Sequence, residues 1–126
     1  MSVFFNRVKN EIDNYSFVTK LTSQEHKSLM TKNSLLPMEY LDFLKEVGYG
    51  DLNFIQIYGG TITADDVYPI EVAKKLTDFL LIGDDGQGYC FAFNIKDNYN
   101  VVEIDPTGEV DFDMGGGFNS FIETFL

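Results

Sequence analysis

The side chains with the greatest capacity for chemistry in this sequence are carboxylates, and they gather toward its end. From Gly83 onward the chain carries nine acidic residues and one base, Lys96, so this segment has a net charge of minus eight. The first fifty residues carry six acids and six bases, whose charges cancel. Grouped carboxylates can serve as a general acid and base, as calcium ligands, or as a docking surface for a cationic partner.

Five of these acids fall within residues 100–113, whose pattern predicts a β-hairpin. The turn Asp105-Pro106-Thr107-Gly108 has proline at the second position of a type I turn, followed by glycine at the left-handed position. A three-residue loop of this kind predicts the register of the two strands. The predicted pairs are Asp105 with Glu109, Ile104 with Val110, Glu103 with Asp111, Val102 with Phe112 and Val101 with Asp113. Val102 and Phe112 would then face the core.

The same register predicts an outer surface made of carboxylates. It would bring together Glu103, Asp105, Glu109, Asp111 and Asp113, with no base among them. Like charges directly opposite one another in a sheet cost up to about 1 kcal/mol per pair. Such a face can keep the sheet soluble and discourage edge pairing, or it can attract a basic protein over long distances. Both interpretations remain open at this point.

A second acidic group, Asp84 and Asp85, lies within the glycine-rich segment from Gly83 to Gly88. The segment has G-x-x-G-x-G spacing, but a β-pattern follows it, no lysine follows its last glycine, and its acids would repel phosphate. We therefore predict no nucleotide site here. Adjacent acids in a glycine turn are more often turn formers than a general-acid pair. Asp84 and Asp85 are predicted to shape the turn and to add to a partner-binding surface.

Other catalytic and metal-binding patterns are incomplete. Asp111-Phe112-Asp113 begins like a calcium loop, but the twelfth position is Ile122 where a glutamate is needed. His26 is the only histidine and lies on a predicted surface helix, where we expect it to be solvated. Cys90 alternates with aromatic residues as a small core side chain. The sequence therefore predicts no catalytic residue, no metal site and no cofactor.

The elements that would position these acids centre on a hairpin over residues 79–93. Its first strand, from Phe79 to Ile82, is a continuous apolar run, as expected of a strand buried on both faces. The second alternates, with Tyr89, Phe91 and Phe93 on one face and the small residues Cys90 and Ala92 on the other. Further strands are predicted at residues 52–58, 100–105 and 109–113.

Helical spacing of apolar residues, with capping residues before them, predicts helices in five places. These are residues 2–15, capped by Ser2 and ending in Tyr15, and residues 22–32, 37–48, 69–75 and 118–125. Thr22 and Glu25 form a capping box, and the thin apolar content that follows them predicts a surface helix. Helices first, an antiparallel sheet next and one closing helix predict an α+β fold in a single domain, residues 1–126.

Composition narrows the possible functions. The 126 residues suit one domain, and twelve Phe and seven Tyr supply a large aromatic core. The net charge of minus eleven argues against nucleic acid or an anionic membrane as a direct partner. A single cysteine and the absence of a secretory h-region predict a cytoplasmic protein. The sequence contains no apolar run long enough to span a membrane.

Four stretches of the chain together resemble the SUKH superfamily, which includes the Smi/Knr cell-wall regulators. The stretches are Thr22-Ser23-Gln24-Glu25, residues 36–50 with Leu36-Pro37 and Tyr40, residues 79–93, and residues 118–126. The resemblance covers roughly residues 22–126, and its matching positions are structural. It implies a non-enzymatic α+β binding domain, most often a bacterial immunity protein that neutralises a toxin, commonly a nuclease.

The charge pattern and the resemblance lead to the same hypothesis. A nuclease that binds phosphate needs a basic cleft, and a compact acidic protein can dock on that cleft and exclude the substrate. We therefore expect a monomeric or weakly dimeric immunity protein that binds a basic toxin through Asp84, Asp85 and the five hairpin acids. A regulatory scaffold of the Smi/Knr kind is the alternative. A small-molecule site would require a polar pocket with convergent titratable groups.

Overall fold

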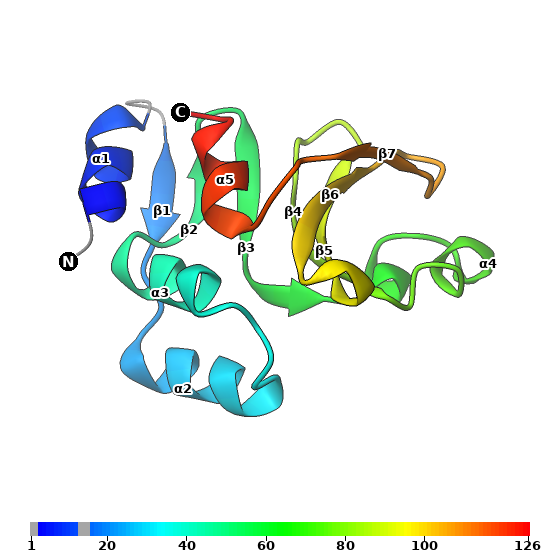
Figure 1. Cartoon of the computed structure of the whole chain (residues 1–126), viewed down its shortest axis with the longest axis horizontal. Helices are drawn as coiled ribbons and strands as arrows, with labels where there is room; N and C mark the ends of the chain where they lie inside the picture. Colours follow the sequence, from blue (N-terminus) through cyan, green and yellow to red (C-terminus); the bar gives the residue numbers. More distant parts are fainter. Residues whose placement is uncertain (1–2, 13–15) are drawn as a thin grey trace.

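The computed structural model describes residues 3–12 and 16–126, which form an α+β fold with helices packed on an antiparallel sheet (Figure 1). In the described residues, seven strands follow one another across the sheet in chain order. They are β1 (Phe17–Thr19), β2 (Tyr49–Leu52), β3 (Ile55–Ile62), β4 (Phe79–Asp84), β5 (Cys90–Asn94), β6 (Asn100–Ile104) and β7 (Val110–Asp113). The predicted fold class is confirmed.

Five described α-helices lie at the predicted places. They are α1 (Val3–Glu11), α2 (Ser23–Lys32), α3 (Met38–Glu46), α4 (Ile70–Ala73) and α5 (Phe118–Glu123). Ser2 and Tyr15, the predicted ends of the first helix, lie outside the described residues. The capping box is confirmed, since the Glu25 amide donates to Thr22 Oγ1 and the Thr22 amide donates to Glu25 Oε1. No residue of α2 is buried, as predicted for a surface helix.

The sheet is strongly curved and has a hydrophobic cluster on each face (Figure 1). The larger cluster lies under α1, α3 and α5, and aromatic rings dominate it. The Tyr40 and Phe118 ring centroids are 5.0 Å apart, as are those of Phe43 and Phe118. The smaller cluster lies on the opposite face and is closed by residues of α4 and its flanking turns, among them Tyr68 and Leu76.

The hairpin of β4 and β5 runs through both clusters, as predicted. On β4, Ile82 belongs to the larger cluster and Leu81 to the smaller one. On β5, Phe91 and Phe93 face the larger cluster, whereas Cys90 and Ala92 face the smaller one. Burial on both faces explains why β4 is a continuous apolar run and why β5 alternates large and small side chains.

Other predictions of local structure are wrong. The strand predicted at residues 52–58 is two strands, β2 and β3, joined by a turn in which Asn53 has a left-handed φ of 53°. The structure also adds β1, which pairs with β2 and which the apolar pattern did not reveal. His26, expected to be solvated, has a side chain only 12% exposed, with Nε2 3.9 Å from Asp42 Oδ1.

Strand β3 changes direction in its second half (Figure 1). It pairs regularly with β4 from Gln56 to Ile57, and the next pair is Ile62 with Leu81. Four residues of β3, 58–61, therefore stand opposite one residue of β4, Ile82. Gly59 and Gly60 lie in this interval, where the absence of side chains permits a sharp bend.

Candidate functional site

The acidic hairpin of β6 and β7 has a different register from the predicted one. The turn is as predicted, because the Asp105 amide donates to the Glu109 carbonyl oxygen at 2.8 Å and Ile104 pairs with Val110. Beyond this point a β-bulge shifts the ladder. Glu103 pairs with Phe112, and Val102 pairs with Asp113. The predicted pairs Glu103 with Asp111, Val102 with Phe112 and Val101 with Asp113 are therefore wrong.

The physical reason is that β7 is the last strand of the sheet and all four of its residues are exposed. Register is strongly specified only where one face of a strand is buried, and bulges are common on edge strands. Phe112, predicted to face the core, is 58% exposed and lies on the face of Glu103. Asp113 is moved to the opposite face, where its Oδ1 accepts a hydrogen bond from the Gly115 amide at 2.8 Å.

Three of the predicted acids lie close enough to act on one another. Burial raises the pKa of Glu103, and the negative charges of Asp111 and Asp85 raise it further. Asp85 comes from the turn between β4 and β5, and Asp111 comes from the bulge of β7. The order of the strands therefore brings Asp85 close to the hairpin acids Glu103 and Asp111. The single face predicted for all five hairpin acids is wrong, because Asp113 lies on the opposite face from Glu103.

The two acids of the β4–β5 turn serve as turn formers, as predicted. Asp85 Oδ1 accepts from the amides of Gln87 and Tyr89, at 2.8 Å and 3.2 Å. Asp84 Oδ1 accepts from the Gly86 amide at 2.9 Å, while its Oδ2 accepts from the Tyr58 hydroxyl at 2.7 Å. Asp84 thus has structural partners at both carboxylate oxygens, and Asp85 is the member of the pair whose charge reaches Glu103.

Asp105 and Glu109 lie at the tip of the hairpin. Asp105 Oδ1 accepts from the Thr107 hydroxyl at 2.6 Å and from the Glu109 amide at 3.0 Å. These bonds, led by the one from Thr107, lower the pKa of Asp105. The Asp105 carboxylate therefore holds the turn. The ion pairs of the described residues are Arg7 with Glu123, His26 with Asp42, Lys74 with Glu71 and Lys96 with Asp78, and none includes a predicted site acid.

Two exposed phenylalanines and one further acid extend the surface beyond what the sequence predicted. Asp51 and Phe54, from the β2–β3 turn region, line a shallow depression of about 270 Å³ together with Asp84 and Asp85. The side chain of Phe54 is 83% exposed. We call Asp51, Asp84, Asp85, Glu103 and Asp111, together with Phe54 and Phe112, the acidic patch. Asp51 and Asp84 lie on one face of the sheet, and Glu103 and Phe112 lie on the other. Asp85, in the β4–β5 turn, connects the two groups, since it lines the depression and its charge acts on Glu103.

Phe54 was missed because it was assigned to the interior of the strand predicted at residues 52–58. Asp51 was missed because it precedes that strand and lies outside the acidic segment that begins at Gly83. The available signal was Asn53, since asparagine tolerates the left-handed conformation that a tight turn requires. Phe112 was missed because the predicted register placed it in the core. No sequence signal marks the bulge.

The buried thiol of Cys90 lacks the surroundings of a nucleophile. Cys90 is 2% exposed, in the smaller cluster, and burial raises the pKa of its thiol, so it is protonated at neutral pH. The nearby Tyr68 hydroxyl donates to the carbonyl oxygen of Asp105 at 3.0 Å. Cys90 is therefore a packing residue, as predicted.

Comparisons with models of protein families, with curated proteins and with solved structures find no match to this chain. The resemblance to the SUKH superfamily therefore stays a prediction. Across residues 3–12 and 16–126, none of the helices has the length and apolar character needed to cross a membrane.

Proposed function

We propose that this protein is a cytoplasmic immunity protein of the SUKH type. It binds and neutralises a basic toxin of the nuclease class through the acidic patch. The observation that carries the proposal is the acidic patch itself. Exposed Phe54 lines a depression with Asp51, Asp84 and Asp85, and exposed Phe112 pairs with Glu103. The carboxylates of the patch form none of the ion pairs found among the described residues.

The two components of the patch supply different parts of a binding reaction. Carboxylates without basic neighbours attract a cationic partner and raise its association rate, an effect that salt weakens. Exposed aromatic rings supply apolar area that a partner can cover, and aromatic residues are enriched among interface hot spots. A charged face that only maintained solubility would gain nothing from two exposed phenylalanines.

The electrostatics of Glu103 support a cationic partner in particular. Its pKa is raised in the isolated protein, first by burial and then by Asp111 and Asp85. A lysine or arginine placed among these three carboxylates would relieve their repulsion. Binding of a basic partner would thus relieve the repulsion among these carboxylates, whereas binding of an acidic or neutral partner would not.

The test starts from the genes that neighbour this one. Each product that is toxic when expressed alone is co-expressed with this protein, and growth rescue and co-purification are measured. The triple variant Asp85→Lys, Glu103→Lys, Asp111→Lys should abolish both. The matched control, Glu11→Lys, Glu71→Lys, Asp97→Lys, changes the net charge equally at exposed acids outside the patch and should keep both. Equal behaviour of the two triple variants would refute the assignment. Binding to a basic protein that is not a toxin would instead favour a regulatory scaffold.

A further inference from the structure

Strand β7 is the last strand of the sheet, at the far end of the strand order from β1 (Figure 1). It pairs with β6 on one side, and on its other side it meets no strand of the described residues. All of its residues, Val110–Asp113, are exposed. A strand in this position offers main-chain donors and acceptors with which a further strand can pair.

The pairing with β6 shows which main-chain groups of β7 point to the open edge. In an antiparallel ladder, successive residues point their N–H and C=O groups alternately toward the partner strand and away from it. The Glu109 carbonyl oxygen accepts from the first amide after β6 at 2.8 Å, and the Met114 amide donates to the Val101 carbonyl oxygen at 2.9 Å. The residues that flank β7 thus face β6. With the bulge counted as one step of the ladder, the N–H and C=O groups of Val110 and Asp113 face the open edge.

The side chains along this edge carry charge of one sign. Residues 109–113 alternate acids with Val110 and Phe112, and all five are exposed. Residues 97–126 contain no lysine or arginine, and the nearest base before them, Lys96, pairs with Asp78 at 3.3 Å. Like charges repel across neighbouring strands, so a second copy of β7 is disfavoured as the added strand. A strand that carries lysine or arginine is attracted instead.

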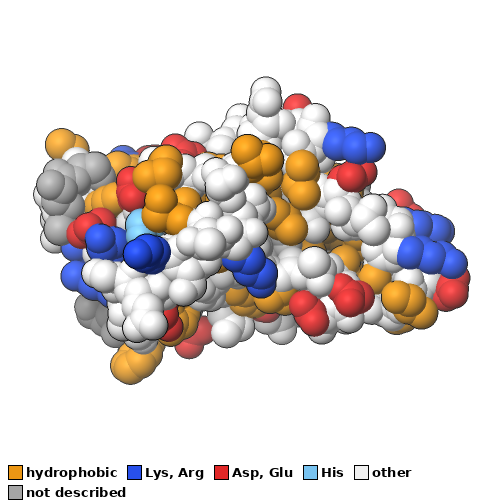
Figure 2. Space-filling model, turned by 90° about the horizontal axis from the view of Figure 1, so that it is seen from below, with side chains coloured by type: hydrophobic (Ala, Val, Ile, Leu, Met, Phe, Trp, Pro, Cys, Tyr) orange, Lys and Arg blue, Asp and Glu red, His pale blue; other side chains and the backbone are white. Residues whose placement is uncertain are grey.

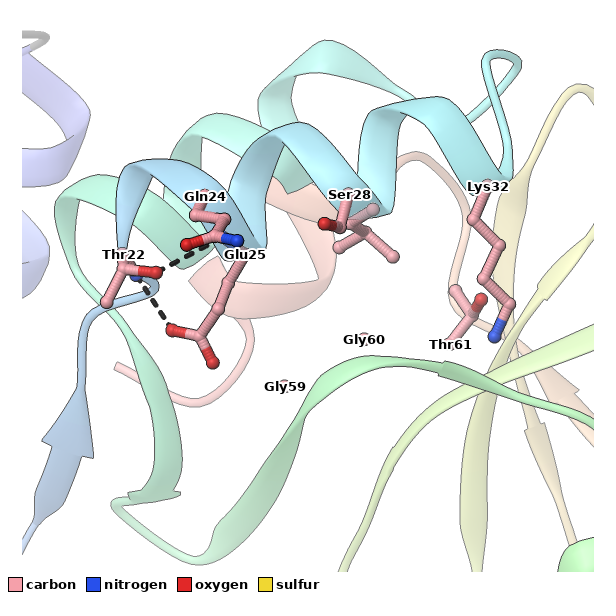
Figure 3. Close-up of a pocket in the computed structure, with 9 residues that line it drawn as sticks. Thr22, Gln24, Glu25, Ser28, Lys32, Gly59, Gly60 and Thr61 are labelled. Carbon is pink, nitrogen blue, oxygen red and sulfur yellow. Dashed lines mark hydrogen bonds between the residues drawn. The ribbon is translucent and has the colours of Figure 1, made fainter.

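Other surfaces of the described residues give no such preference. Figure 2 shows lysine and arginine side chains beside aspartate and glutamate on the face seen from below. The groove between α2 and β3, of about 430 Å³, is lined by one acid, Glu25, and one base, Lys32 (Figure 3). The other edge strand, β1, has three residues and none is charged. Among these features, the β7 edge is the one that combines free main-chain groups with charge of a single sign.

We propose that β7 accepts an extended, basic segment of the partner protein as a further strand of the sheet. This inference rests on the proposed function and describes how the basic partner is held. The segment pairs its main chain with Val110 and Asp113, while its lysine or arginine side chains lie against the acids of residues 109–113. The main-chain pairing supplies affinity, and the acids select basic side chains. The apolar stems of those side chains cover the exposed ring of Phe112.

The test uses two nonapeptides, acetylated and amidated, one alternating threonine with lysine and the other alternating threonine with glutamate. Each is titrated into the isotope-labelled full chain, and amide hydrogen exchange is followed by NMR. The lysine peptide should bind saturably and slow the exchange of the Val110 and Asp113 amides about tenfold or more, whereas the glutamate peptide should not. Absence of this protection overturns the proposal even where resonances shift, because contact through side chains alone leaves these amides open to water.

Three variants separate main-chain pairing from charge. Val110→Pro removes a donor at the open edge without changing the charge, and proline is tolerated as the first residue of an edge strand. It should weaken binding of the lysine peptide about tenfold. Asp111→Lys should weaken binding by a similar factor through repulsion, whereas the matched control Glu11→Lys, at an exposed site on α1, should weaken it by less than about twofold. Unchanged binding by Val110→Pro, or equal losses in the two lysine variants, overturns the proposal.

The peptide test and the co-expression test can fail separately. Growth rescue by a protein whose Val110 and Asp113 amides gain no protection from the lysine peptide would overturn the added strand and leave the proposed function standing. Protection by the peptide without rescue from any toxic neighbour would support the added strand and count against the toxin as its source. Exchange of the Val110 amide that slows with protein concentration in the absence of peptide also overturns the proposal, because the occupant is then a second copy.

Discussion

Replacing Glu103 by glutamine should stabilise the protein at neutral pH. The substitution keeps the shape of the side chain and removes a charge that is partly desolvated and repelled by Asp111 and Asp85. Repulsion between neighbouring carboxylates on a sheet surface amounts to a few tenths of a kcal/mol up to about 1 kcal/mol, and solvent screens it. We therefore expect the free energy of unfolding to rise by about 0.5–1 kcal/mol, which raises Tm by about 2–4 °C.

The pH dependence of this gain follows from the sign of the pKa shift. The pKa of Glu103 is raised in the folded state above the ordinary 4.5, so the folded protein binds this proton more tightly than the unfolded chain does. The Glu103 contribution to the free energy of unfolding therefore decreases as pH rises from the ordinary pKa through the raised one. The gain from Glu103→Gln should be full above this interval and vanish below it.

Urea denaturation at pH 7 and pH 3, in low and high salt, measures these expectations. The control is Glu109→Gln, on the same hairpin, because Glu109 is not among the acids that raise the pKa of Glu103. The increase in the free energy of unfolding from Glu109→Gln should be smaller than that from Glu103→Gln. The reasoning is refuted if Glu103→Gln fails to stabilise at pH 7 in low salt, or if its gain persists at pH 3. The variant should also bind the proposed basic partner more weakly, so a gain in stability would accompany weaker binding.

Three further predictions concern apolar and backbone positions. Phe54→Ser and Phe112→Ser should each change the free energy of unfolding by less than about 0.5 kcal/mol. Each should weaken binding of the proposed partner about tenfold or more, as measured by calorimetry. An unchanged affinity would exclude these rings from the interface. Tyr40→Phe should stabilise by about 1 kcal/mol in urea denaturation, since the buried Tyr40 hydroxyl has no hydrogen-bond partner among the described residues; destabilisation would contradict this. Gly83→Ala should lower the free energy of unfolding by about 3 kcal/mol or more, because the new Cβ would lie 2.3 Å from the Gln56 carbonyl oxygen. A variant whose Tm equals that of the wild type would refute this close approach.

The parts of the fold that the sequence predicted well are those where burial leaves a periodic pattern. The β4–β5 hairpin has large rings facing one cluster and small residues facing the other, so alternation alone assigned its faces. Helix α2 was marked by its capping box. By contrast, β1 is three residues long and Phe17 is 76% exposed, so its pairing with β2 left no apolar pattern.

The candidate site was predicted only in part, because its members meet through the order of the strands. Asp51 and Asp85 are distant in sequence, and they come to line one depression because β2, β3 and β4 are neighbours in the sheet. The turn chemistry of Asp84 and Asp85 was local and was predicted correctly. The bulge of β7 was not predictable, because a fully exposed strand has no buried side chain to specify its register.

The bulge itself bears on whether the acidic surface serves solubility or binding. A regular ladder would have turned Phe112 toward the smaller cluster, whereas the bulge turns its ring toward the face of Glu103, where Asp111 also acts. Solubility would favour burying this ring. The bulged strand instead exposes it next to two carboxylates that repel each other, an arrangement that a partner carrying both a cation and an apolar surface would relieve. The geometry of one edge strand thus favours binding over solubility.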